Sequence, residues 1–278
     1  MLAHYSGLLY ALDQQTGGWL GRAWGYLQAQ MPVLQQADLP TSTGLRVSDL
    51  PEDEKMALPA HQPEDPALVR HSHYTLLYNE AHEQAQWVAY KLESHETQGE
   101  TERADDFRPD PAVRTGSAEL EDYRDSGYDR GHLAPAADFR FSASAMSESF
   151  FMSNMSPQVH EFNAGIWSEL EQQVRKWARQ EGHVYVVSGP ILEENLRKIG
   201  PNRVSVPRQY FKVILDTSPP GAKAIAFLLP HRESYLSPRS YAISIDELEK
   251  ITGLDFFPNL PDEVEGSLES SVSLMGWF

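Results

Sequence analysis

The spacing of apolar residues predicts several β-strands in this chain. Two runs rich in aromatic and β-branched residues, Tyr74–Tyr78 and Gln86–Leu92, are joined by a polar Asn-Glu-Ala-His turn and predict a β-hairpin. Short apolar runs at Val184–Val187, Tyr210–Leu215 and Ala224–Leu229 are typical of buried strands.

A second spacing, with apolar residues every three to four positions, predicts helices. From Asn163 this stripe continues to about Gln180. Ser244 resembles the first residue of a capping box before a helix at Ile245, and Gly253 is expected to end that helix. Strand hairpins combined with a few helices favour an α+β fold over a doubly wound parallel sheet.

The N-terminal part of the chain has a different pattern. Residues 1–50 contain two amphipathic segments, which we expect to form helices that pack on the main domain; dimerisation or partner binding is the open alternative. Residues 51–66 hold four prolines and five acidic residues, which predicts a linker. Residues 93–127 are polar and acidic, and are expected to run over the surface.

Composition narrows the classes of protein. Apolar residues make up 41% of the 278 residues, as in ordinary globular proteins. The absence of cysteine excludes disulfides, thiolate nucleophiles and Cys-based zinc sites. No Lys or Arg precedes Arg22, and the longest early apolar run, Leu8–Leu12, is too short for a membrane span. No signal peptide is visible in this sequence.

Charge is distributed unevenly along the chain. The net charge of −17 argues against a nucleic-acid partner, because phosphate binding depends on Lys and Arg. However, residues 123–215 hold 11 Lys and Arg against 10 Asp and Glu, so the acidity lies outside this segment. We interpret the acidic remainder mainly as a solubility feature.

The segment from Tyr128 contains the candidate chemistry. His132 has an imidazole that can accept a proton from water at neutral pH, although a lone histidine is more often a structural hydrogen-bonding group. Arg130 would share a face with His132 in an extended segment, where its guanidinium can bind a phosphate. Gly131 between them permits close approach of a substrate.

Two polar residues lie on the apolar stripe of the helix that begins near residue 163. Asn163 can coordinate a hard cation through its carboxamide oxygen or simply cap the helix. Glu171 would be buried, and an unpaired buried carboxylate is costly. A hydrated cation or an arginine partner would resolve that cost.

Three ordered motifs resemble one known family. YDRGH at 128–132, SNMSPQ at 153–158 and FNAGIW at 162–167 are similar to motifs of the DNA/RNA non-specific endonuclease family. The likeness covers about residues 68–261 and implies a ββα-metal (His-Me finger) fold, with a central antiparallel sheet and flanking helices. We therefore predict a nuclease domain at 67–262, followed by a C-terminal tail at 263–278.

The resemblance implies a role for each matching residue. His132 corresponds to the general base, Asn163 to the single direct protein ligand of a hydrated Mg²⁺, and Arg130 to the arginine near the scissile phosphate. Mn²⁺ is the expected substitute for Mg²⁺. Other matches are expected to support the base, the substrate or the metal-bound waters, or to bind phosphate: Asn154, Gln158, Glu171 and Arg175. A further phosphate-binding arginine matches Arg103, with Arg108 as the alternative.

The implied activity is Mg²⁺-dependent, sequence-non-specific hydrolysis of DNA and RNA that leaves 5′-phosphate and 3′-hydroxyl ends. Two alternatives remain open: a catalytically silent binding module of the same fold, and a phosphodiesterase for a smaller substrate. A free nuclease would endanger its own genome, so export to the periplasm or medium, or an inhibitor protein, is expected. A homodimer through residues 1–60 is a further hypothesis.

Overall fold

The computed structural model describes residues 54–62 and 65–278. All of them belong to the second of two compact units, which spans Thr43–Phe278. The helices predicted within residues 1–50 lie outside the described residues.

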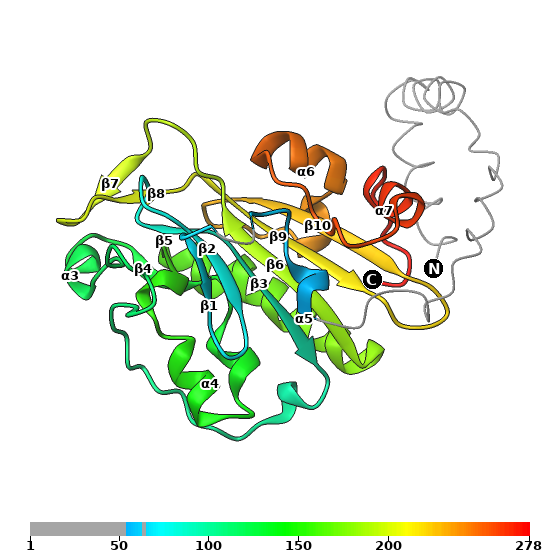
Figure 1. Ribbon diagram of the computed structural model, residues 1–278, viewed down its shortest axis with the longest axis horizontal. Helices are drawn as coiled ribbons and strands as arrows, with labels where there is room; N and C mark the ends of the chain where they lie inside the picture. The colour runs from blue at the N-terminus through cyan, green and yellow to red at the C-terminus, as the bar shows by residue number, and fades with distance from the viewer. Residues whose placement is uncertain (1–53, 63–64) are drawn as a thin grey trace, which may run out of the picture. The chain divides into compact units, whose positions relative to one another are not determined.

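A seven-stranded sheet forms the centre of the domain (Figure 1). Every neighbouring pair of strands in it is antiparallel. In spatial order the strands are β1 (Leu68–Arg70), β2 (Thr75–Asn79), β3 (Gln84–Glu93), β6 (His183–Pro190), β9 (Gln209–Asp216), β10 (Lys223–Pro230) and β11 (Ala242–Ile243). The predicted hairpin and the three predicted buried strands are confirmed, and so is the α+β fold class.

Both faces of the sheet are covered, which explains why the central strands are apolar on both sides. In β6, Val184 and Val186 face a core built with α5 (Ser168–Glu181). Their neighbours Tyr185 and Val187 face a second core built with α6 (Ile245–Thr252). Since successive residues of a strand point to opposite faces, one short apolar run contributes to two cores.

The segment that carries the candidate motifs forms a ββα unit beside the sheet. The strands β4 (Asp129–His132) and β5 (Met155–Gln158) pair antiparallel, and His132 lies opposite Met155. The helix predicted from Asn163 is present but kinked in its first turn, because within Phe162–Trp167 (η6) the backbone of Gly165 is non-helical (φ −96°, ψ −115°). Apolar spacing over one turn does not reveal a kink at a single residue. The α-helix α5 starts only at Ser168.

Shorter elements complete the domain. The other α-helices are α3 (Leu120–Tyr123), α4 (Ala143–Glu148) and α7 (Asp262–Glu269), and a small ladder joins β7 (Arg197–Ile199) to β8 (Val204–Val206). The 3₁₀ turns are η2 (Glu54–Ala57), η3 (Glu96–Gln98), η4 (Ala136–Phe139), η5 (Met152–Asn154) and η7 (Pro238–Tyr241). No described helix is long and apolar enough to cross a membrane.

Two peripheral regions differ from the predictions in detail, and the predicted ends of α6 are confirmed. Within the predicted linker, Met56 and Ala57 have no exposed surface and pack into the core on the α6 side, so this part belongs to the domain. The C-terminal tail packs on α5, where the Trp177 indole donates to the carbonyl of Trp277 (2.6 Å). Ser244 caps α6 through the Glu247 amide, and Gly253 ends that helix at φ 69°.

Candidate active site

The β4–β5 ladder fixes the position of His132. Its backbone carbonyl accepts a hydrogen bond from the Trp167 indole at 3.1 Å, which ties β4 to the helix that follows β5. The Trp167 hydrogen bond and the pairing with β5 both hold the backbone of His132, so rigid elements rather than a loop position its imidazole.

The His132 side chain lies in an aromatic frame formed by Phe107 and Phe150. Only 8% of the residue is exposed, and the ring packs edge-on against Phe150 with centroids 5.0 Å apart. Its Nε2 is buried and has no hydrogen-bond partner among the described residues. Burial, and then the positive charges of Arg103 and Arg130, lower the pKa of His132 to about 3. The imidazole is therefore neutral at pH 7 and available to accept a proton.

Two arginines are held over the same aromatic frame. The Arg130 guanidinium lies 4.2 Å from the Phe107 ring centre, and that of Arg103 lies 4.8 Å from the Phe150 ring centre. Arg108 is engaged elsewhere: its guanidinium donates to Ser147 and Asp106, and it stacks on Phe151. The geometry therefore favours Arg103 over Arg108 as the upstream arginine of the site.

Asn163 lines a cavity of about 470 Å³. Arg103, Arg130 and Asp129 line the same cavity. The Asn163 carboxamide nitrogen donates to Asp129 Oδ2 at 3.0 Å, which leaves the carboxamide oxygen free to serve as a ligand. Carboxamide and carboxylate oxygens are hard donors that suit Mg²⁺ or Mn²⁺. The donor set at this cavity thus fits the divalent cation that the motifs imply.

Asn154 has a different environment from the other predicted site residues. It is completely buried, and its carboxamide exchanges hydrogen bonds with the backbone N–H and carbonyl of Ala134 (2.9 Å each). A third bond runs to the carbonyl of Ser149. Asn154 therefore fixes the segment just after His132 rather than facing the cavity.

Gln158 lies under β4, against Gly131. Its carboxamide is buried, and neither of its polar atoms has a hydrogen-bond partner among the described residues. A Cβ on Gly131 would lie 2.2 Å from the Gln158 carboxamide carbon. Gly131 is thus required for close packing inside the ladder, in addition to any approach of a substrate.

Replacing Gly131 by alanine is expected to destabilise the fold by about 1–3 kcal/mol, because the new methyl group overlaps Gln158 in a closed space. Urea unfolding measures the change. Gly221→Ala is the matched control, since a Cβ there meets no atom within 4 Å. Equal stabilities of the two variants would contradict this packing.

A buried cluster of charges adjoins the site at α5. Arg175 donates to Asp138 at 2.8 Å, and Asp138 also accepts a hydrogen bond from Tyr90. Burial raises the pKa of the Glu171 carboxyl, opposed by Lys212 and Arg175. Burial also lowers the pKa of the Lys212 ammonium. Glu171 therefore lies in the positive field of Arg175 and of Lys212 from β9, while the ion pair of Arg175 itself is with Asp138.

The structure brings together most of the residues predicted from the motifs. Arg103, Arg130, His132 and Asn163 share the cavity or its aromatic frame, whereas Gln158 and Asn154 lie beneath it. Sequence reasoning missed Phe107 and Phe150, which hold the arginines and the imidazole, and it assigned no role to Asp129. Only the place of Asp129 inside the YDRGH motif indicated its importance.

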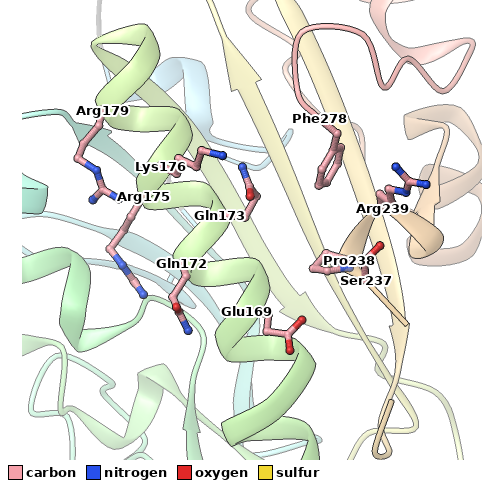
Figure 2. Close-up of a pocket in the computed structure, with 10 residues that line it drawn as sticks. All are labelled: Glu169, Gln172, Gln173, Arg175, Lys176, Arg179, Ser237, Pro238, Arg239 and Phe278. Carbon is pink, nitrogen blue, oxygen red and sulfur yellow. The ribbon is translucent and has the colours of Figure 1, made fainter. Parts of the chain in front are cut away.

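A second hollow, of about 810 Å³, lies along α5 (Figure 2). Figure 2 shows Gln173 and Lys176 on the side of α5 that faces Phe278 and Pro238, with Arg175 and Arg179 along the other side. Four basic residues and one acidic residue line it: Arg175, Lys176, Arg179, Arg239 and Glu169. This surface is basic in a protein that is acidic overall.

Comparison with known proteins agrees with this geometry. Residues 54–263 match the sequence model of the DNA/RNA non-specific endonuclease family. A protein named "Nuclease" from Nostoc sp. is 33% identical over 88% of this chain and 92% of its own length. Human "Endonuclease G, mitochondrial" is 34% identical, with 67% of this chain and 68% of that protein covered.

A third relative and a solved structure extend the comparison. "Nuclease EXOG, mitochondrial" from Danio rerio is 37% identical over 68% of this chain, which spans 60% of that protein. A chain in the crystal structure titled "Crystal structure of the EndoG/EndoGI complex: Mechanism of EndoG inhibition" superposes with a TM-score of 0.69 at 28% identity, covering 81% of this chain and 96% of that one. The chain therefore belongs to the DNA/RNA non-specific endonuclease family and is a hydrolytic, metal-dependent nuclease.

Proposed function

We propose that the chain hydrolyses phosphodiester bonds within DNA and RNA, with Mg²⁺ as the natural cation, and leaves 5′-phosphate and 3′-hydroxyl ends. The observation that supports this most is the position of the His132 ring, which contacts Phe107 and Phe150. Arg130 and Arg103, which line the cavity that Asn163 faces, stack on these same two rings. Asn163 and Asp129 are the residues that would hold the cation or its waters.

In this proposal His132 accepts the proton of a water that attacks phosphorus. Arg103 and Arg130 bind the scissile phosphate, and their aromatic supports keep the guanidinium groups in place. The ion pair of Arg103 with Asp105 is exposed on both sides, so a phosphate displaces it at little cost. When bound, Mg²⁺ supplies positive charge that stabilises the transition state at phosphorus and the departing 3′ oxygen. That oxygen takes up a proton from a water molecule as the bond to phosphorus breaks, which gives the 3′-hydroxyl.

The positive charges of Arg103 and Arg130 also make the basicity of His132 depend on whether substrate is bound. In the free protein burial, and to a smaller extent the positive charges of both arginines, lowers the pKa of His132. A phosphodiester placed between the arginines offsets their part of this shift, so the pKa of the imidazole rises when substrate binds. A base is most effective when its pKa is close to the working pH.

The ends of the products test the cleavage chemistry. Linear products of a closed-circular plasmid are expected to prime a DNA polymerase directly, because they carry 3′-hydroxyls. Polynucleotide kinase should label them only after phosphatase treatment, because their 5′ ends carry phosphate. Products that fail to prime until their 3′ ends are dephosphorylated would refute the proposed direction of cleavage.

The basic surface along α5 favours a polynucleotide over a small phosphodiester. Lys176 and Arg179 are exposed on it, one and four residues after Arg175 of the charge cluster. A backbone that continues past the cleaved bond would meet these charges, whereas a dinucleotide would not reach them. Absence of cleavage with any divalent metal would favour the silent-module alternative.

Replacing Lys176 and Arg179 by glutamine is expected to weaken DNA binding and to lower the slope of log K against log salt concentration by about 2, since about 0.9 counterion is released per phosphate contact. Binding is measured in EDTA, so that cleavage does not interfere. Hydrolysis of a dinucleotide analogue should be unchanged.

The matched control removes two exposed charges elsewhere, Arg70 on β1 and Lys250 on α6. This pair is expected to change the salt slope much less. Equal slopes for the two double variants would show that α5 does not contact the substrate.

A further inference from the structure

Three carboxylates converge on the side of the domain that carries α6 and α7. Asp246 and Glu249 come from α6, and Glu269 is the last residue of α7. One oxygen from each lies within 4.8 Å of the others. This cluster is distinct from the cavity that Asn163 faces, and none of its members was singled out by the motifs.

Glu269 is the unusual member of this cluster. The residue is only 6% exposed, and its Oε1 is buried without a hydrogen-bond partner among the described residues. Burial raises the pKa of its carboxyl to about 8, and the four charges that add most to this shift are all negative: Glu249, Glu265, Asp246 and Asp255. An ionised carboxylate surrounded by like charges is costly to bury, so this group is either protonated or joined by a cation.

The spacing of the oxygens fits a large, hard cation. Three oxygens evenly spaced around one Ca²⁺ at about 2.3–2.6 Å are about 4.0–4.5 Å apart, so ligand atoms that lie within 4.8 Å of one another can reach a common ion with a small adjustment of the side chains. Glu249 keeps its second role at the same time, because its Oε1 accepts a hydrogen bond from the Phe256 amide at 2.8 Å. Carboxylate oxygens supplied by flexible side chains, with water completing the shell, are typical of Ca²⁺ sites.

We propose that Asp246, Glu249 and Glu269 form a structural Ca²⁺ site that fastens α7 to α6. The family match ends at residue 263, so the site would join a helix of the family domain to a segment beyond that match. The tail that follows α7 leads to Trp277, whose carbonyl and ring contact Trp177 of α5. The cation would thus stabilise the C-terminal segment without taking part in catalysis.

The test uses the full chain with Asn163→Ala, so that the catalytic cation site is removed. After EDTA treatment and dialysis, Ca²⁺ is expected to bind this protein with a stoichiometry of one by calorimetry. The melting temperature should rise by about 5–10 °C when Ca²⁺ exceeds its dissociation constant about 100-fold. Absence of both effects would overturn the proposal.

A second variant assigns the effect to the cluster. Adding Glu269→Gln should abolish both the calorimetric binding and the rise in melting temperature, and this protein should fold because glutamine mimics the protonated carboxyl. Glu263→Gln, on the exposed side of α7, is the matched control and should retain both. Retained binding in the Glu269→Gln protein would contradict the site, whatever the outcome of the nuclease experiments.

Discussion

Replacement of His132 by alanine is expected to lower the rate of DNA cleavage by about 10³-fold, within the range that general base catalysis contributes. The fold should persist, because the Trp167 bond to residue 132 and the β4–β5 ladder use backbone atoms of that residue. Since the ring is buried against Phe150, its removal leaves a pocket in which added imidazole can act as the base. Partial rescue by imidazole is therefore expected.

The measurement is single-turnover nicking of a plasmid, with near-ultraviolet circular dichroism as the check on folding. His95→Ala is the control, since the His95 side chain is 70% exposed and pairs with Glu93 away from the site. Undiminished cutting by the His132→Ala protein would exclude this histidine as the base.

Asn163→Ala is expected to reduce cleavage by about 10³-fold or more and to remove the response to Mg²⁺. A bound cation contributes several kcal/mol to the stabilisation of a phosphoryl transition state, and each 1.36 kcal/mol corresponds to about a factor of ten in rate. Asp129 would lose the carboxamide that it holds, but it is partly exposed and can be hydrated. The variant should therefore remain folded.

Binding of Mn²⁺, followed by electron paramagnetic resonance, gives a readout that does not depend on activity. The experiment is done with Glu269→Gln also present, so that the cluster at α6 and α7 does not contribute. Gln172→Ala, an exposed position on α5, should leave Mn²⁺ binding unchanged. Wild-type Mn²⁺ binding in the Asn163→Ala protein would remove Asn163 as the ligand.

Local patterns in the sequence predict many of the strands and helices of the fold. The hairpin of β2 and β3 and the apolar runs of β6, β9 and β10 were predictable because side chains alternate along a strand. The kink at Gly165 was not predictable, because one non-helical residue leaves almost the same apolar spacing. Burial of Met56 was also hidden, since prolines and acidic neighbours dominate the composition around it.

Some residues of the candidate site were predictable from the sequence and others were not. His132, Arg130 and Asn163 lie in short motifs, so a resemblance identifies them directly. Phe107 and Phe150 are distant in sequence from His132 and meet it only through the fold, and no periodicity signals such a contact. The charge environment of Glu171 was also not predictable, because Lys212 reaches the cluster from a separate strand.

The sequence alone could not decide whether Arg103 or Arg108 is the upstream phosphate-binding arginine. Both lie near the FRPDP segment, and both carry the same charge. Their difference is tertiary: Arg103 stacks on the phenylalanine that also contacts His132, whereas Arg108 is bound to Ser147 on α4. Distances between elements, rather than residue type, separate the two.

The most direct test of the account is whether a covalently closed substrate is cut only when a divalent cation is present. EDTA-treated wild-type protein is incubated with closed-circular DNA and with circular RNA, with and without Mg²⁺, beside His132→Ala purified in parallel to exclude a contaminating nuclease. We predict that Mg²⁺ restores cutting of both circles by the wild-type protein alone. Cutting in EDTA, or no cutting with Mg²⁺ or Mn²⁺, would contradict a metal-dependent endonuclease centred on His132 and Asn163.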